Sequence, residues 1–263
     1  MKKLFLLLIL FVSTAVVYAA ENVKLPEKSK FKLVLLIGQS NMAGRGFVES
    51  ADKVPHPRVV MLDKNGNWVP AVDPVHFDKR TAGVGLARTF ANMLADDNPD
   101  CVIGLIPAAC GGSSLIHWKP GVYFKPTKSH PYDDAVNRAK KAMNDGTLCA
   151  ILFHQGEADG KRANVYHQYL SQLIDALRNE LGARQVPFII GQLSTAKPMS
   201  KARLKVDAAH RTCVLECQPA GFVPSNGLTL NPDNIHFDRK SLIEFGKRYY
   251  QVYKEVVNRR NAK

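Results

Sequence analysis

The chain has 263 residues, a length that fits one large domain or two small ones. Hydrophobic residues make up 46 %, which excludes a fibre or a disordered chain. The formal net charge is +13, but the basic residues are scattered, with no zinc-finger or RNA-binding signature. We therefore expect a globular protein with a solvated basic surface and no nucleic-acid partner.

The N-terminus has the features of an export signal. Two lysines precede an apolar run at residues 4–17, which is shorter than the roughly 20 residues needed to cross a bilayer. Small residues at the junction predict cleavage after Ala19. We expect a signal peptide at 1–19 and a single domain at 20–263, secreted or periplasmic and away from the membrane after cleavage. An uncleaved N-terminal anchor is the alternative.

The rest of the chain alternates apolar strands with amphipathic helices. This order predicts a parallel sheet covered by helices on both faces, with ligands bound at the carboxyl ends of the strands. The two longest loops are expected at 63–82 and 111–131. The predicted strands are 33–37, 59–62, 102–106, 150–153 and 188–190, and the predicted helices are 84–95, 133–143, 164–181, 201–217 and 241–257.

Five cysteines leave the disulfide pattern open. Cys101 and Cys149 each open a predicted strand and could lie side by side. Cys213 and Cys217 are four residues apart on a predicted helix, where a bridge is awkward. The fifth is Cys110, and the odd number leaves a free thiol unless one pairs with another chain. Neither a paired CxxC nor an HExxH is present, so we predict no metal site.

Ser40 is the candidate nucleophile. It follows the strand 33–37 within Gly38-Gln39-Ser40-Asn41-Met42, at the end of a strand and near a helix N-terminus. That position favours developing negative charge, although a serine there could also be only a helix cap. The segment is not a GxSxG elbow, because Met42 replaces the second glycine.

Asp233 and His236 can complete the catalytic group. A serine nucleophile needs a base, and the base needs a partner that fixes its tautomer. Residues three apart can meet across one turn, so Asp233 could hold one ring nitrogen while the other faces Ser40. An incidental histidine in a surface loop is the alternative.

Two further polar segments follow predicted strands. The segment 107–114 contains Gly111 and Gly112, which permit close approach of the backbone to a ligand. His154-Gln155-Gly156-Glu157 follows the strand 150–153, and the Gln155 amide could donate to an oxyanion. Simple turns and backbone-bonded loop residues are the alternatives. All these segments fall where buried strands end, which favours a shared site.

Four motifs together resemble those of the sialate O-acetylesterase-like carbohydrate esterases. They are GQSNMAGRG (38–46), GLIPAACGGSSLIHW (104–118), HQGEAD (154–159) and DNIHF (233–237). The chain looks most like carbohydrate esterase family 6, the acetyl xylan esterases. The resemblance implies an SGNH-hydrolase fold, a flavodoxin-like three-layer α/β/α sandwich around a parallel sheet.

The resemblance also implies roles for individual residues. Ser40, His236 and Asp233 match the nucleophile, base and carboxylate. The oxyanion hole would comprise the N–H groups of Ser40 and Gly112 and the Gln155 side chain. Gln155 stands where other SGNH enzymes carry an asparagine, and Ser113 replaces a more usual threonine. The implied chemistry is acyl transfer from an acetylated carbohydrate without a metal or organic cofactor.

The sequence leaves several alternatives for the substrate and the residues that bind it. Asn41, Trp118 and Glu157 are candidates for substrate contact, and the loop from Ser113 to Pro131 is expected to shape the sugar site. Trp118 could stack on a sugar ring or pack beneath the loop. A sialate O-acetylesterase would use the same chemistry as an acetyl xylan esterase on a different sugar. A non-catalytic carbohydrate-binding protein of the same fold is the third possibility.

Overall fold

A computed structural model describes residues 24–262, which include a seven-stranded sheet in the order β3-β2-β4-β1-β5-β6-β7. All neighbouring strands are parallel except β2 and β3, which are antiparallel. The mainly parallel sheet confirms the predicted fold class. The strands are β1 (Phe31–Gly38), β2 (Val59–Leu62), β3 (Trp68–Pro70), β4 (Val102–Pro107), β5 (Thr147–His154), β6 (Phe188–Gly191) and β7 (Ala220–Val223).

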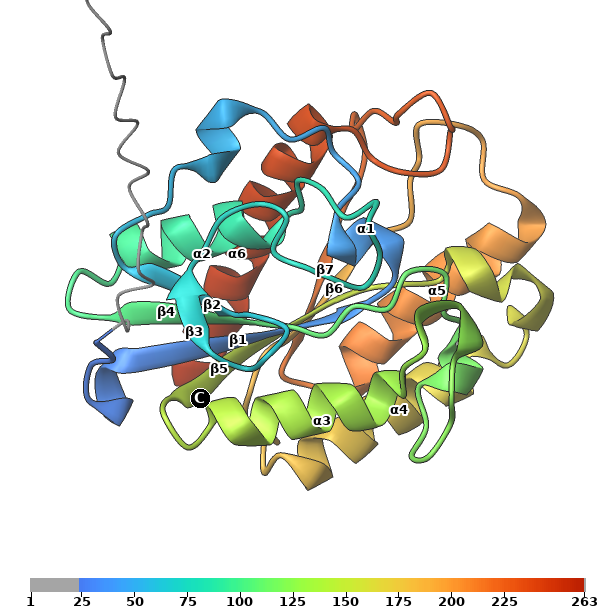
Figure 1. Cartoon of the computed structure of the whole chain (residues 1–263). Helices are drawn as coiled ribbons and strands as arrows, with labels where there is room; N and C mark the ends of the chain where they lie inside the picture. The colour runs from blue at the N-terminus through green and yellow to red at the C-terminus, as the bar shows by residue number, and fades with distance from the viewer. Residues whose placement is uncertain (1–23, 263) are drawn as a thin grey trace, which may run out of the picture.

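Helices cover both faces of this sheet, giving three layers (Figure 1). On one face lie α2 and α6, which pack against each other, and on the other lie α3, α4 and α5. The α-helices are α1 (Ser40–Ala43), α2 (Ala87–Asp96), α3 (Pro131–Ala142), α4 (Tyr166–Glu180), α5 (Lys201–Glu216) and α6 (Arg239–Asn261). Short 3₁₀ turns are η1 (Lys28–Lys30), η2 (Ser50–Lys53), η3 (Leu115–His117), η4 (Lys125–Thr127) and η5 (Glu157–Arg162).

The central strand β1 explains why its sequence is apolar throughout. Leu33 and Leu35 belong to the core beneath α3, α4 and α5, whereas Val34 and Leu36 belong to the core beneath α2 and α6. All four side chains have no exposed surface. A strand buried on both faces has no polar alternation, and each such side chain contributes about 2 kcal/mol of hydrophobic stabilisation.

Two short strands were not predicted. β3 lies inside the expected loop 63–82 and pairs with β2 at the edge of the sheet, where none of its three residues is buried. β7 closes the opposite edge through four residues. Neither segment is long enough to show a periodic pattern. Each forms a strand because it pairs with a neighbouring strand.

All five cysteines are free thiols, so the pairing that the strand positions allowed for Cys101 and Cys149 does not form. The expected signal peptide at 1–19 lies outside the described residues. Within 24–262, no helix has both the length and the apolar character required to cross a bilayer.

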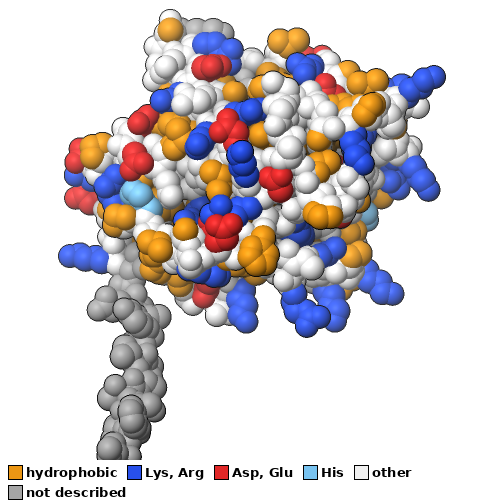
Figure 2. Space-filling model, turned by 90° about the horizontal axis from the view of Figure 1, so that it is seen from above, with side chains coloured by type: hydrophobic (Ala, Val, Ile, Leu, Met, Phe, Trp, Pro, Cys, Tyr) orange, Lys and Arg blue, Asp and Glu red, His pale blue; other side chains and the backbone are white. Residues whose placement is uncertain are grey.

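The excess positive charge is spread across the surface seen in Figure 2. Lys and Arg side chains occur over this face and around its rim, with acidic and apolar side chains between them. Such mixing is typical of a solvated face.

Candidate active site

The candidate site lies at the carboxyl edge of three adjacent strands. β1 lies between β4 and β5 in parallel register, so the segments that follow these strands leave the sheet at the same edge. Ser40 follows β1, Gly112 follows β4 and Glu157 follows β5. The convergence expected from the sequence is therefore present in the fold.

Gly38 permits the turn that presents Ser40. Its φ is +130°, and a Cβ at this position would lie 2.1 Å from the His154 carbonyl oxygen. The backbones of β1 and β5 thus approach too closely for a side chain. The next residue, Gln39, donates its N–H to the same carbonyl at 2.9 Å, and α1 then begins at Ser40.

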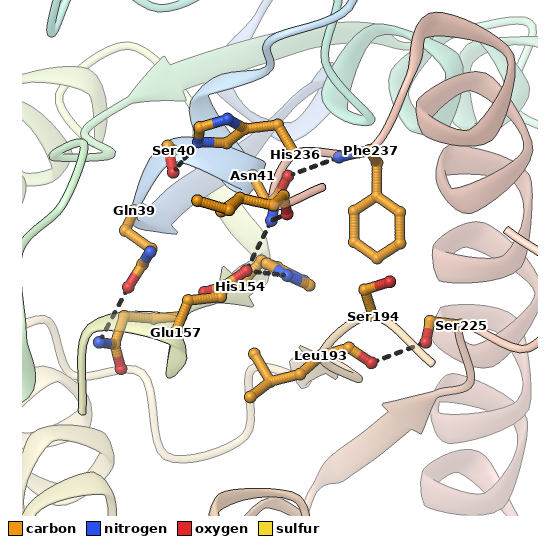
Figure 3. Close-up of polar contacts among 12 residues, drawn as sticks. Gln39, Ser40, Asn41, His154, Glu157, Leu193, Ser194, Ser225, His236 and Phe237 are labelled. Atoms are coloured by element: carbon orange, nitrogen blue, oxygen red, sulfur yellow. Dashed lines mark hydrogen bonds and ion pairs between the residues drawn. The ribbon is translucent and has the colours of Figure 1, made fainter. Parts of the chain in front are cut away.

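The structure brings Ser40 and His236 together (Figure 3), and it places Asp233 at the other nitrogen of the His236 ring. His236 Nε2 lies 2.9 Å from Ser40 Oγ, and Nδ1 lies 2.7 Å from Asp233 Oδ2. Because a carboxylate only accepts hydrogen bonds, Nδ1 carries the proton in this arrangement. Nε2 of the neutral ring then accepts from the Ser40 hydroxyl, which is the geometry required of a general base.

Asp233 is fixed by the turn that it begins. Its Oδ1 accepts the backbone N–H groups of Ile235 and His236, each at 2.9 Å. Desolvation would raise the pKa of Asp233, but these hydrogen bonds and the bond to the His236 ring lower it to about 2. The carboxylate is therefore ionised when it holds the imidazole.

Asn41 clamps the backbone on both sides of His236. Its Nδ2 donates to the Ile235 carbonyl at 3.3 Å, and its Oδ1 accepts the Phe237 N–H at 3.0 Å. The same Nδ2 donates to Glu157 Oε1 at 2.6 Å. Asn41 is only 1 % exposed, so the structure places it as a brace for His236 and not as the substrate contact expected from the sequence.

Glu157 joins this brace to β5. His154 Nε2 lies 3.3 Å from the same Oε1 (Figure 3), and the His154 side chain has no exposed surface. Burial favours the neutral acid, but the His154 ring and the Asn41 amide outweigh it and lower the pKa of Glu157 to about 2. An ionised carboxylate thus supports the amide that holds His236. Glu157 also lines the hollow beside Ser40, where its Oε2 has no partner among the described residues.

A shallow hollow of about 370 Å³ opens over Ser40 and His236. Two basic side chains line it, Arg45 and Lys79. The Arg45 guanidinium is paired with Asp78 at 3.0 Å, whereas no acidic partner of Lys79 occurs among residues 24–262. The hollow therefore places the Lys79 ammonium and the Glu157 carboxylate near the serine. No group of three His, Cys, Asp or Glu residues within 24–262 could hold a metal ion.

The backbone offers two donors to an oxyanion. Both Ser40 and Gly112 line the hollow, and neither of their N–H groups donates to an acceptor among residues 24–262. Gly112 has a φ of +86°, a conformation that glycine adopts without strain. The neighbouring Gly111 N–H is occupied, because it donates to Asp78 Oδ2 at 2.9 Å. These placements agree with the two backbone groups named from the sequence.

Gln155 does not belong to the oxyanion hole. Its side chain is completely buried, and its Nε2 donates to Gln39 Oε1 at 3.2 Å, to the Ser113 carbonyl at 3.1 Å and to Asp159. Its Oε1 accepts from the Tyr166 hydroxyl at 2.8 Å. These interior acceptors use the amide hydrogens, so Gln155 supports the loop beneath the site.

Trp118 packs beneath its loop and does not face the substrate. It is 2 % exposed, and its indole N–H donates to Ser113 Oγ at 2.9 Å. None of the loop between Ser113 and Pro131 lines the hollow over Ser40. The aromatic side chains of this loop fold inward or pair with each other, as His117 and Phe124 do, so they do not stack on a sugar at Ser40.

Several residues that line the hollow were missed from the sequence. Arg45 lies within the GQSNMAGRG segment, so its closeness to Ser40 could have flagged it. Lys79 and Thr81 come from a loop without a motif, and only the fold brings them to the serine. Ile235 was inside the DNIHF segment, but nothing in its side chain suggested exposure of 46 %.

Known proteins resemble this chain in sequence and in architecture. A probable carbohydrate esterase of Arabidopsis thaliana is 28 % identical over 249 residues, covering 84 % of this chain and 90 % of its own. Its crystal structure superposes with a TM-score of 0.75, at 27 % identity over 86 % of this chain and 98 % of that chain. NanS superposes with a TM-score of 0.71 at 16 % identity, covering 89 % of this chain and 100 % of its own.

A carbohydrate acetylesterase of Xanthomonas citri has a TM-score of 0.65 at 18 % identity, over 87 % of this chain and 57 % of its own. At such identities these two structures establish likeness of fold. The family comparison reaches further, because residues 30–255 match a single family over most of the chain. The solved structures that resemble this chain have the SGNH-hydrolase fold. The chain belongs to the carbohydrate esterase, sialic acid-specific acetylesterase family.

Proposed function

We propose that this protein hydrolyses acetyl esters on a carbohydrate such as acetylated xylan, using Ser40 as the nucleophile. The observation that carries this proposal is the hydrogen-bonded series from Ser40 Oγ through His236 to Asp233, at 2.9 and 2.7 Å. A serine, a base and an orienting carboxylate in this order are the requirement for acyl transfer. The proposal is also supported by membership of a carbohydrate esterase family.

In the first half of the reaction, Ser40 Oγ attacks the acetyl carbonyl carbon while His236 Nε2 takes the hydroxyl proton. Asp233 stabilises the imidazolium that forms. The N–H groups of Ser40 and Gly112 face the negative oxygen of the tetrahedral intermediate. When the bond to the sugar oxygen breaks, His236 returns the proton to that oxygen and the deacetylated sugar leaves.

In the second half, water attacks the acetyl-serine. His236 removes a proton from the water, and the same backbone donors stabilise the second tetrahedral intermediate. Collapse of this intermediate breaks the ester bond, the proton returns to Ser40 and acetate leaves. These two reaction steps need no group other than the substrate, water and the residues named.

A second candidate substrate is an O-acetylated sialic acid, which carries a carboxylate. It is favoured by the Lys79 side chain, which lines the hollow with no acidic partner within 24–262. Acetate release from acetylated xylan and from O-acetylated sialic acid, compared as kcat/KM, decides between the two. Loss of activity on one substrate alone in Lys79→Met identifies the sugar that this ammonium contacts.

The central test is Ser40→Ala, measured by acetate release from p-nitrophenyl acetate and acetylated xylan. We expect a loss of at least about a thousandfold on both, because the nucleophile is removed. Ser171→Ala on α4 is the matched control and should keep full activity. A folded Ser40→Ala protein with near-normal turnover would remove Ser40 from the mechanism.

We also propose that the protein acts outside the cytoplasm after cleavage at Ala19. The proposal rests on the charge and apolar pattern of residues 1–19. N-terminal sequencing of the protein from its native host tests it. A mature chain that still begins at Met1 would contradict it.

A further inference from the structure

A second cavity lies on the other side of the segment that follows β4. It measures about 230 Å³ and is enclosed by residues 76–78, 107–110, 127–129 and the first two turns of α3. The proposed mechanism uses none of these residues. The cavity therefore needs its own explanation.

Two buried polar atoms at this cavity have no hydrogen-bond partner within 24–262. His76 is 3 % exposed and its Nε2 is unpartnered, and the side chain of Asp78 is 2 % exposed with an unpartnered Oδ1. Burial lowers the pKa of His76 to about 4, so its ring is neutral near pH 7 and can accept or donate one hydrogen bond. Buried polar atoms in proteins are normally satisfied, so these two atoms mark this part of the protein as more polar than its internal hydrogen bonds require.

The remaining polar groups at the cavity add hydroxyls and a guanidinium. Thr127 Oγ1 and Ser129 Oγ lie 2.8 Å apart, and Thr127 Oγ1 also lies 2.9 Å from Cys110 Sγ. The Arg138 guanidinium packs over the Phe77 ring at 4.7 Å and donates through Nη1 to the Pro107 carbonyl at 2.6 Å. The wall thus offers several donors and acceptors within a small volume.

The charges of the wall balance. Its acidic side chains are Asp78 and Asp134, and its basic side chains are Lys128 and Arg138. A wall with no excess charge does not favour a free anion or cation. The hydroxyls, carboxylates and guanidinium that line the cavity match the hydroxyl groups of a neutral sugar.

The cavity is connected to the catalytic hollow through Asp78. Its Oδ2 accepts the Gly111 N–H at 2.9 Å and the Arg45 guanidinium at 3.0 Å, and both Gly111 and Arg45 line the hollow over Ser40. A Cβ on Gly111 would lie 2.5 Å from this oxygen, so the contact is tight. The two cavities are therefore separated by one carboxylate and one turn of backbone.

We propose that this second cavity binds a neutral, unacetylated sugar unit of the substrate while the acetylated unit lies at Ser40. The assignment to the substrate rests on the proposed function, whereas sugar binding by the cavity does not. Binding there would hold Asp78 and Gly111 in place, next to the oxyanion donor Gly112. The cavity would thus select a carbohydrate chain over a small acetyl ester.

The test uses the double variant Thr127→Val/Ser129→Ala, which removes two hydroxyls and keeps the shape. Ser171→Ala/Thr212→Val is the matched control, because it makes the same changes on α4 and α5. Ser129→Leu fills the cavity and tests the same claim without relying on lost hydrogen bonds. Folding of every variant is checked by its thermal unfolding transition.

Binding is measured by ligand-observed NMR with xylose, xylobiose, galactose and glucose, and separately with sodium sulfate and sodium acetate. At least one sugar should bind with a Kd below about 10 mM. Both cavity variants should weaken that binding at least tenfold, and the control should not. Failure of every sugar to bind, binding of the anions alone, or sugar binding unchanged in the variants would overturn the proposal.

Kinetics then test the assignment to the substrate. The double variant should raise KM for an acetylated oligosaccharide about tenfold and leave p-nitrophenyl acetate kinetics unchanged. An unchanged KM for the oligosaccharide would remove the subsite. Absence of any ester hydrolysis by the wild type would instead contradict the proposed function, while the sugar-binding result would stand separately.

Discussion

At the scale of single residues, the position of His236 depends on a brace that lies behind it. His236 is held from its ring by Asp233 and from its backbone by Asn41. Asn41 comes from the same short helix as Ser40, so the residue next to Ser40 also fixes His236. Glu157 completes the arrangement by accepting from the Asn41 amide at 2.6 Å.

We predict that Glu157→Gln lowers kcat for acetyl ester hydrolysis about tenfold, a loss of roughly 1.4 kcal/mol of transition-state stabilisation. The substitution keeps the shape but removes the charge that strengthens the bond to Asn41. The backbone clamp on His236 should loosen as a result. The measurements are kcat and KM for p-nitrophenyl acetate and the rate at which diisopropyl fluorophosphate inactivates Ser40.

Both the turnover and the inactivation rate should fall together if Glu157 acts through His236. Glu180→Gln on α4 is the control, since this carboxylate is exposed and pairs only with Lys140. A normal inactivation rate in Glu157→Gln would show that the brace does not position the base.

At the scale of secondary-structure elements, the junction of β1 and β5 decides where Ser40 lies. Gly38 ends β1 with a positive φ, and its register partner is His154. The carbonyl oxygen of His154 occupies the space that a side chain would need. β1 and β5 can therefore remain paired up to the first residues of the site.

We predict that Gly38→Ala lowers the free energy of unfolding by about 3 kcal/mol or more. The new methyl group meets a backbone oxygen that cannot move without breaking the strand pairing, and the positive φ adds strain. Urea unfolding followed by circular dichroism measures the change.

Gly182→Ala separates the cost of backbone strain from the cost of the close contact with His154. Gly182 has a φ of +59° and open space around its Cα, so this variant incurs only the backbone strain of about 1 kcal/mol. Equal destabilisation of the two variants would mean that the close approach to His154 contributes nothing.

The segment that carries His236 is also anchored at its far end, where α6 begins. The segment 231–238 leads into α6, whose N-cap Asp238 accepts the Ser241 N–H at 2.8 Å. Arg239 donates to both carboxylate oxygens of Asp52 at 2.8 and 2.9 Å, which ties the start of α6 to η2. The base thus returns to the sheet edge on a helix fixed at its first turn.

At the scale of the whole molecule, one buried carboxylate opposes the stability supplied by the two cores. Asp73 is 2 % exposed and belongs to the segment between β3 and α2. Burial raises its pKa to about 7, against the opposing effect of Arg88, whose guanidinium lies 3.6 Å away. The folded protein therefore binds a proton at Asp73 that the unfolded chain releases near pH 4.

We predict that the contribution of Asp73 to the free energy of unfolding falls as the pH rises from about 4 to about 7. Between these values the folded state holds the proton and the unfolded state does not, so each rise in pH favours unfolding. The contribution of Asp73 reaches at most about 4 kcal/mol over this window. Asp73→Asn removes this titration, so the free energy of unfolding of the wild type should fall relative to that of the variant as the pH rises.

Urea midpoints between pH 4 and pH 8 measure this effect. Asp100→Asn, at an exposed aspartate before β4, is the matched control and should follow the wild type. Identical pH profiles for the wild type and Asp73→Asn would show that Asp73 does not couple folding to protonation.

The sequence alone determined the order of the five longest-recognised strands and the long helices, and the place of Ser40 at the end of one of these strands. The runs around 33–37, 102–106 and 150–153 are apolar because both faces of these strands are buried, and this pattern is local. Parallel strands leave a sheet at one edge, so the order of strands in the chain is enough to group the residues that follow them. Ser40, Asp233, His236 and Gly112 lie where that reasoning expected them.

Only the tertiary structure decided which polar side chains face the hollow and which face the interior. Gln155, Asn41 and Trp118 carry polar groups within the motifs, yet their hydrogen-bond partners lie in the interior and use those groups within the protein. Lys79 belongs to no motif and reaches the hollow through a long loop. The direction of a side chain depends on neighbours far away in the chain, and local pattern holds no information about them.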